Sequence, residues 1–149
     1  MDDEANKAKT GIVGLDDILL GGLARRAMYL LEGEPGAGKT TAALQYLLEG
    51  ASRGERSLYI TLSETEEELR KGAASHGWTL SDDIEVFELV PAEVLLEADQ
   101  QQTLLYSADL ELGETTKRIF EAVERVNPSR IVLDSLSEIR LLAQSSLRY

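Results

Sequence analysis

The 149-residue sequence contains no cysteine and a single histidine. Without thiols the chain can form neither a disulfide nor a thiolate metal site, and this composition favours a cytoplasmic protein. One histidine leaves no histidine pair for a metal ion and no recognisable Ser-His-Asp triad. Aromatic residues are also scarce, at 5% against 43% hydrophobic residues in all, so we expect a core of leucine, isoleucine, valine and alanine.

The sequence also lacks long apolar runs and an excess of basic residues. No run approaches the roughly 20 apolar residues of a membrane-spanning helix, and the acidic start, Met1-Asp2-Asp3-Glu4, is unlike a signal peptide. Only 15 lysines and arginines stand against 27 aspartates and glutamates, which gives a net charge of −12. Because nucleic-acid binding rests largely on phosphate neutralisation, we do not expect a nucleic-acid partner. Because no apolar run is long enough, we do not expect a membrane partner either.

One stretch, residues 33–41, carries the strongest chemical signal. Its sequence is Gly33-Glu34-Pro35-Gly36-Ala37-Gly38-Lys39-Thr40-Thr41, which matches G-x-x-x-x-G-K-[ST], the phosphate-binding P-loop. The glycines allow successive backbone N–H groups to close around a phosphate without Cβ clashes. Lys39 offers a positive charge for the β- and γ-phosphates of a nucleotide, and the Thr40 hydroxyl is a hard oxygen ligand that suits Mg²⁺.

The segments on either side of the P-loop agree with this interpretation. Residues 27–31 form a short apolar run of the kind found in buried strands. After the loop, apolar residues recur at helical spacing, at Leu44, Leu47, Leu48 and Ala51. We therefore expect a strand at residues 27–31 and a helix at 39–53 that Gly54 ends. A glycine-rich turn that matched the pattern by chance would need neither neighbour.

The rest of the chain alternates predicted strands and helices, which indicates one α/β domain over residues 10–149 with mostly parallel strands. Strands are expected at residues 57–62, 84–89 and 130–135, the second of them near the sheet edge. Helices are expected at residues 63–75, 114–126 and 136–144. Capping boxes are expected to open the first and the last of these helices, formed by Ser63 with Glu66 and by Ser135 with Glu138.

Three segments have less regular patterns. Residues 1–9 are predicted to be a disordered tail. Residues 10–19 predict a compact segment that either packs over the sheet edge or helps to shape a nucleotide site, and the spacing favours neither. Residues 90–112 predict a long loop with at most one helical turn, which is consistent with a functional loop and with a surface insertion alike.

Two acids follow predicted strands, at the sheet edge where parallel α/β proteins bind their ligands. Asp134 ends an apolar strand, as does the Walker B acid that holds Mg²⁺, although an aspartate there also serves as a helix N-cap. Glu64 is the candidate general base for attack of water on the γ-phosphorus, or an acid that favours the helix dipole. The glutamates at 66–68 are expected on a solvated helix face, and His76 and Trp78 at a helix end.

Together these residues resemble the RecA-like ATPases and, among them, the KaiC-like proteins. The resemblance covers about residues 10–144 and is weakest over residues 90–112. It rests on Thr10-Gly11-Ile12, Gly14-Leu15-Asp16, Gly21-Gly22-Leu23, Gly33 to Thr40, Tyr59-Ile60-Thr61-Leu62-Ser63-Glu64-Thr65 and Arg130 to Glu138. The block of threonine, glycines and aspartate ahead of the P-loop is its most distinctive part.

The resemblance implies a three-layer α/β P-loop NTPase fold that binds ATP with Mg²⁺ at the subunit interfaces of a ring-like, often hexameric homo-oligomer. It assigns the loop residues and Lys39 to the phosphates, Thr40 and Asp134 to the metal, and Glu64 together with Lys39 to catalysis. It also implies a regulatory or signalling role with protein partners. A nucleotide-gated assembly module with little turnover and a DNA-repair recombinase-like ATPase are the alternatives.

Two features depart from the KaiC-like pattern. KaiC carries paired glutamates after its second strand, whereas this chain has Ser63-Glu64, so a single carboxylate remains and kinase activity is not expected. In RecA-like sheets a further strand, from after the Walker B segment, lies between the P-loop strand and the Walker B strand. The sequence to Tyr149 does not supply it, so we expect the N-terminal portion of such a domain.

Overall fold

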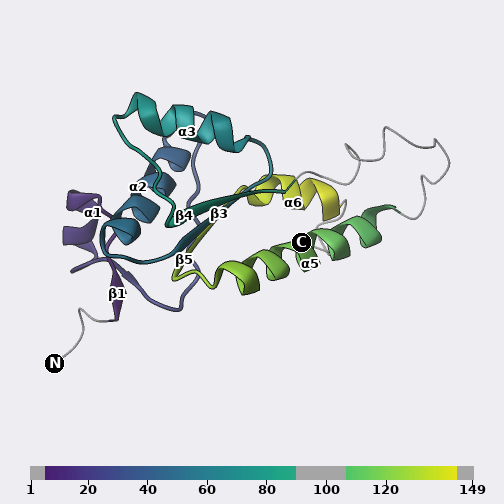
Figure 1. Cartoon of the computed structure of the whole chain (residues 1–149), viewed down its shortest axis with the longest axis horizontal. Helices are drawn as coiled ribbons and strands as arrows, with labels where there is room; N and C mark the ends of the chain where they lie inside the picture. Colours follow the sequence, from purple (N-terminus) through teal and green to yellow (C-terminus); the bar gives the residue numbers. More distant parts are fainter. Residues whose placement is uncertain (1–5, 90–106, 144–149) are drawn as a thin grey trace.

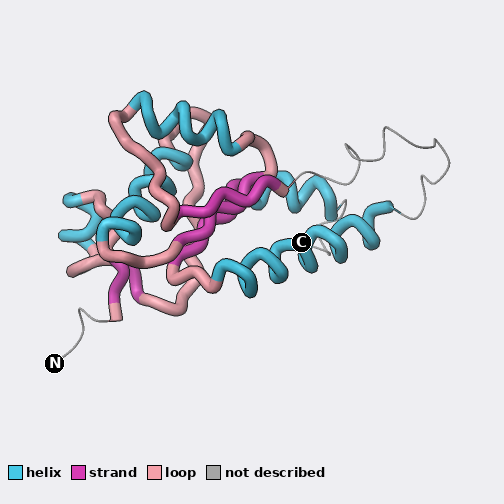
Figure 2. The backbone as a smooth tube through the Cα atoms, in the orientation of Figure 1, coloured by secondary structure: helices cyan, strands magenta, loops and turns pink. Residues whose placement is uncertain are grey.

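A three-stranded parallel sheet is the centre of the fold. The computed structural model describes residues 6–89 and 107–143. In it β3 (Ser57–Thr61) lies between β4 (Ile84–Glu88) and β5 (Arg130–Asp134), and both pairings are parallel (Figures 1 and 2). In the register, Thr61 lies opposite both Glu88 and Asp134. The strands therefore end together, and the groups that follow them gather at one edge of the sheet.

Helices cover both faces of this sheet and complete three layers. On one face lie α2 (Lys39–Ser52) and α3 (Glu66–Ser75), and on the other lies α5 (Ser107–Val126) with α6 (Leu136–Ala143) beside it (Figure 1). This arrangement confirms the predicted α/β class with a parallel sheet. None of the helices in the described residues is long and apolar enough to cross a membrane.

The central strand β3 is buried along its whole length, as expected for a strand covered on both faces. Its side chains alternate between the two layers. Tyr59 packs with α2 and α3, where its cluster includes Leu44, Leu47, Leu69 and Ala73. Leu58 and Ile60 point to the other face, where they pack with Ala122 and Val126 of α5. Each layer of helices is thus attached to the sheet by apolar contacts.

The N-terminal residues form a small unit of their own. Strands β1 (Lys7–Ala8) and β2 (Leu23–Ala24) pair antiparallel, and the short helix α1 (Val13–Ile18) lies between them in the chain. The Asp16 carboxylate accepts hydrogen bonds from Thr10 N (2.7 Å), Thr10 Oγ1 (2.8 Å) and Gly11 N (3.1 Å). The prediction of a disordered tail over residues 1–9 is wrong for Lys7 and Ala8, because Ala8 is buried; residues 1–5 lie outside the described residues.

This unit packs against α2 and the start of β5. Gln45 Nε2 of α2 donates to Gly11 O (2.7 Å), and Arg130 at the start of β5 donates to Lys9 O (2.6 Å). Figure 1 shows α1 and β1 at the end of the sheet opposite α6. Of the two roles left open for residues 10–19, packing against the sheet and α2 is therefore the one that the structure shows.

Two predicted element boundaries are corrected. The segment 90–112 was expected to be a loop, but α5 begins at Ser107 and contains Gly113 in its interior; residues 90–106 lie outside the described residues. The capping box of α3 is formed by Thr65 with Glu68, not by Ser63 with Glu66. Thr61 Oγ1 bonds both to Glu64 N (3.0 Å) and to Glu64 O (2.8 Å), which extends the turn after β3 and starts the helix later.

The prediction of a strand before the P-loop is also wrong for this chain. Residues 27–34 have no regular secondary structure, and the side chains of Met28, Leu30 and Leu31 are 95%, 69% and 57% exposed. A strand is held by hydrogen bonds from a neighbouring strand. Within the described residues the sheet ends at β5, and no strand lies between β5 and this apolar segment.

Candidate functional site

The P-loop leads directly into α2, as its sequence predicts. Gly38 is the N-cap residue of α2 and has φ +88°, a left-handed conformation that glycine adopts without strain. No side chain caps this helix end. The backbone N–H groups of the first turn are therefore left without a side-chain acceptor, at the positive end of the helix dipole. Free N–H groups at the positive end of a helix dipole are the kind of arrangement that binds phosphate groups in proteins.

Lys39 lies over the loop itself. Its Nζ donates to Gly33 O (2.7 Å) and Glu34 O (2.9 Å), and the loop residues 33–38 are all exposed. The ammonium group is thus held on the same side of the loop as the first turn of α2. Its present partners are two neutral carbonyl groups, which a phosphate oxygen can replace as a stronger, charged acceptor.

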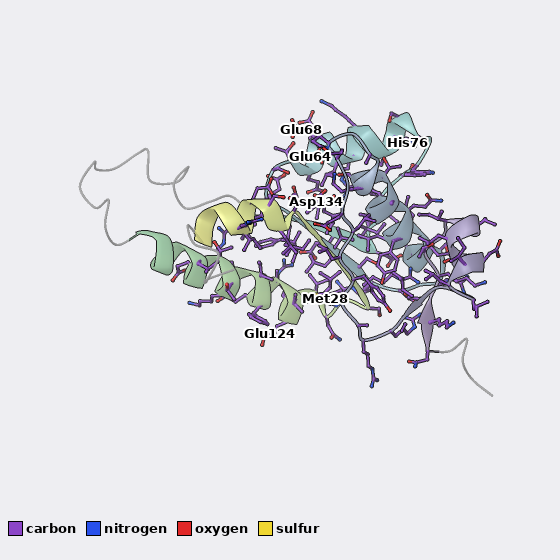
Figure 3. The ribbon with its side chains drawn as sticks, turned by 180° about the vertical axis from the view of Figure 1, so that it is seen from behind. Met28, Glu64, Glu68, His76, Glu124 and Asp134 are labelled. Atoms are coloured by element: carbon purple, nitrogen blue, oxygen red, sulfur yellow. The ribbon has the colours of Figure 1, made fainter. Side chains whose placement is uncertain are left out.

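The P-loop and β5 meet at a cluster of three oxygen atoms. Thr40 Oγ1 donates to Asp134 Oδ2 (2.9 Å), although 94 residues separate them in the chain. Tyr59 Oη, from the middle of β3, donates to the same oxygen (2.5 Å). Figure 3 shows Asp134 at the end of the sheet, close to Glu64 and Glu68. The structure therefore brings together the two residues that were predicted to hold the metal.

Glu64 lies in the turn after β3. Burial raises the pKa of Glu64, and the negative charges of Asp134 and then Glu68 raise it further. Its backbone is fixed by the two hydrogen bonds to Thr61 Oγ1. The Glu64 carboxylate thus has a raised proton affinity and lies within electrostatic reach of Asp134.

Other singled-out residues lie outside the cluster. Glu66 and Glu67 form exposed ion pairs with Arg70 (2.7 Å) and Lys71 (2.6 Å) along α3. His76 is the C-cap of α3 and stacks on Trp78, with ring centroids 4.9 Å apart. Both findings agree with the expectation of a solvated helix face and a helix end.

The residues present fit a magnesium ion. Mg²⁺ is usually held by one or two protein oxygens, with water and phosphate oxygens as the remaining ligands. Thr40 and Asp134 provide a hydroxyl and a carboxylate in direct contact. Within residues 6–89 and 107–143 there is no cluster of three or more His, Cys, Asp or Glu side chains of the kind that binds a metal without a substrate.

Sequence reasoning missed Tyr59 and Arg130. Tyr59 was assigned no role in the site on sequence grounds, but a tyrosine inside a buried strand must place its hydroxyl against a polar partner, and that requirement was a usable signal. Arg130 is fully buried, and its Nε lies 2.5 Å from Glu55 Oε2. A charged residue at the start of an otherwise apolar strand was the corresponding signal, since buried charges are paired.

Comparison with known proteins identifies relatives over nearly the whole chain. The family model of the KaiC ATPase matches residues 8–149. The circadian clock protein KaiC3 of Synechocystis sp. is 37% identical over 139 residues, which are 92% of this chain and 27% of that protein. A UPF0273 protein of Aeropyrum pernix is 33% identical over 140 residues, 91% of this chain and 56% of that protein.

The circadian clock oscillator protein KaiC of Prochlorococcus marinus is 31% identical over 137 residues, 91% of this chain and 26% of that protein. The chain thus spans between about a quarter and just over half of the length of these curated relatives. Its P-loop, its parallel sheet and the acid at the end of β5 lie within the matched region. The chain belongs to the KaiC ATPase family and forms the N-terminal portion of the RecA-like fold of that family.

Proposed function

We propose that this chain binds ATP with Mg²⁺ and forms the nucleotide-binding part of a KaiC-like ATPase with a regulatory or signalling role. The observation that carries the proposal is the contact of Thr40 Oγ1 with Asp134 Oδ2 at 2.9 Å. It joins the residue after the P-loop lysine to the acid that ends β5. A glycine-rich turn that matched the P-loop pattern by chance would not be expected to contact that acid.

The residues divide the work by their chemistry. The N–H groups of the P-loop and the Lys39 ammonium group bind the phosphates of ATP. Thr40 and Asp134 would hold Mg²⁺, which neutralises the negative charge of the phosphate oxygens. Asp134 keeps Thr40 in place through their hydrogen bond, so the hydroxyl stays beside the P-loop.

Glu64 acts as the general base in this proposal. Its carboxylate accepts a proton from a water molecule as the water oxygen attacks the γ-phosphorus, and the bond to the β–γ bridging oxygen breaks to release ADP and phosphate. The raised pKa of Glu64, caused first by desolvation and then by the charges of Asp134 and Glu68, makes its carboxylate a stronger base than a glutamate without these neighbours.

Two substitutions test the proposal. Lys39→Ala should abolish nucleotide binding, and Glu64→Gln should retain binding and lose phosphate release. Lys71→Ala and Glu67→Gln are matched controls, because these exposed side chains pair with each other on the surface of α3. Isothermal titration with ATP and Mg²⁺ measures binding, and a phosphate assay measures turnover. Unchanged turnover in Glu64→Gln would remove the catalytic role of this residue.

A second candidate is a nucleotide-gated assembly module with little turnover. It is supported by Ser63, which stands beside Glu64 where KaiC has a second glutamate, so the site has one carboxylate fewer. Two of the relatives are named as circadian clock proteins, which also suits a regulatory role. Size-exclusion chromatography with light scattering, with and without ATP, separates the candidates: ATP-dependent homo-oligomers such as hexamers with negligible phosphate release favour the module.

A DNA-binding recombinase-like ATPase has weaker support. The net charge of −12 opposes binding to a polyanion. Tight binding to DNA that weakens steeply with added salt would favour this function over the other two.

A further inference from the structure

The hydroxyl of Tyr59 contacts Asp134 although its ring belongs to the core. Tyr59 Oη donates to Asp134 Oδ2 at 2.5 Å, and Thr40 Oγ1 donates to the same oxygen at 2.9 Å. Tyr59 is 0% exposed and packs with Leu44, Leu47 and Leu69. Its ring is therefore fixed by the layer between the sheet and α2, and its hydroxyl reaches the edge of that layer.

The phenol hydroxyl acts as a donor in this contact, because Tyr59 Oη donates to the Asp134 carboxylate. A phenylalanine would fill the same apolar space, so the hydroxyl contributes something that packing alone does not need.

We propose that Tyr59 is a positioning residue of the Mg²⁺ site, which holds the Asp134 carboxylate in the orientation that a cation shared with Thr40 needs. This inference rests on the proposed function. The Thr40 hydroxyl can donate to Asp134 and still offer a lone pair to the cation, whereas Tyr59 acts only on Asp134. Carboxylate ligands held by such a second hydrogen bond lose metal affinity when that bond is removed.

Tyr59→Phe tests the inference, because it removes only the hydroxyl. We expect ATP binding in the presence of EDTA to stay as in the unaltered chain, and the affinity of the ATP complex for Mg²⁺ to fall about 10- to 100-fold. Tyr46→Phe is the matched control: this tyrosine lies on α2, and its ring packs against Arg130, 4.6 Å from the guanidinium carbon. Its Mg²⁺ titration should match that of the unaltered chain.

Each outcome decides between roles. Equal losses of ATP affinity with and without Mg²⁺ in Tyr59→Phe would mean that the residue only supports the fold, and this would overturn the inference. An unchanged Mg²⁺ titration would overturn it as well. Failure of the unaltered chain to bind ATP under either condition would instead refute the proposed function, and the role of Tyr59 with it.

A measurement on the unaltered chain covers the case in which Tyr59→Phe does not fold. Tyrosine labelled with ¹³C at Cζ reports on each of the five tyrosine hydroxyl groups by NMR. The Tyr59 resonance is the one that remains when each of the others is replaced by phenylalanine in turn. It should shift when Mg²⁺ is added to the ATP complex, and a resonance that does not move would contradict the inference.

Discussion

At the scale of single residues, three carboxylates near the ends of β3 and β5 govern the electrostatics of the site. The pKa of Glu64 is raised by burial first and then by the charges of Asp134 and Glu68. Glu68 itself has a lowered pKa, because the backbone N–H and the hydroxyl of Thr65 donate hydrogen bonds to it. Glu68 is thus a fixed negative charge that acts on Glu64 without being part of the metal site.

The pH dependence of ATP hydrolysis should report this arrangement. A base works only when it is deprotonated, so the rate should fall as the pH drops through the raised pKa of Glu64. Glu68→Gln removes one cause of the raised pKa and keeps an oxygen acceptor for Thr65 N. The acidic limb of the pH–rate profile should then move to lower pH, and it should stay in place in Glu67→Gln. An unmoved limb in Glu68→Gln would contradict the coupling.

A second group of charged residues surrounds the buried Arg130 at the other end of β5. Arg130 bonds to Glu55 Oε2 (2.5 Å), Lys9 O (2.6 Å) and Tyr46 O (2.7 Å), and Glu55 also pairs with Arg25. Burial raises the pKa of Glu55, but the hydrogen bonds from Arg25 and Arg130 outweigh burial and lower it overall. The cluster links the N-terminal unit, α2 and β5.

The space for Arg130 depends on Gly50. A Cβ at Gly50 would lie 2.6 Å from Arg130 Cδ and Nε, and the guanidinium group is fixed by its partners. Gly50→Ala should therefore lower the free energy of unfolding, by about 1–3 kcal/mol as in other overpacked sites. Gly72→Ala is the matched control in α3, where nothing lies within 4 Å, and it should raise stability by about 0.5–1 kcal/mol. Urea unfolding of both variants measures this, and a stable Gly50→Ala would show that Arg130 can move.

At the scale of elements, the parts with strong local signals were predicted correctly. The sequence predicts α2 at residues 39–53, and the structure has Lys39–Ser52, because apolar periodicity and Gly54 mark its course and end. The three paired strands agree to within a residue at each end. The position of Asp134 at the edge where the strands end follows from the rule that parallel strands gather their carboxyl ends. The roles of these residues stay predictions.

The wrong element predictions arise where two local sequence signals compete, or where a neighbouring segment determines whether an element forms. Ser63 with Glu66 and Thr65 with Glu68 have the same spacing, and only the turn closed by Thr61 selects the second pair. The apolar run at residues 27–31 has the composition of a strand, but strand formation also needs a partner. Periodicity contains no information about that partner.

The choice of capping box makes a prediction at this scale. Thr65 Oγ1 accepts a hydrogen bond from Glu68 N (3.2 Å), and Thr65 N donates to Glu68 Oε2 (2.8 Å). Thr65→Ala should therefore lower the free energy of unfolding by about 1 kcal/mol. Ser63→Ala, two residues earlier in the turn, should change it by less than about 0.5 kcal/mol. Thermal unfolding of the two variants checks this, and equal losses would mean that α3 begins at either residue.

At the scale of the whole molecule, an apolar segment and a strand edge lie open together. Residues 28–31 carry four large apolar side chains that are at least half exposed, and β5 is the last strand of the described sheet. Exposed apolar surface of this kind marks a place where another segment or another protein packs. The family relatives are longer than this chain, so they have sequence to place there.

A chimaeric chain tests whether a strand fits between β5 and residues 27–31. It joins this chain to the part of the Aeropyrum pernix relative that follows the matched region. We expect slower hydrogen exchange at residues 27–31 in the chimaera than in the 149-residue chain. Peptides from β3, which is buried already, should exchange alike in both chains. Unchanged exchange at residues 27–31 would show that the added segment packs elsewhere.

The contact of Thr40 with Asp134 also has a consequence for folding. Its two residues are 94 positions apart, and Tyr59 is 75 positions from Asp134. Contacts between such distant positions form only after a large loop has closed, so they are late and costly in chain entropy. A ligand that binds across them stabilises only chains in which β5 has already docked beside β3. ATP with Mg²⁺ would therefore stabilise chains in which the three strands are paired, and it would not stabilise chains that have formed only their helices.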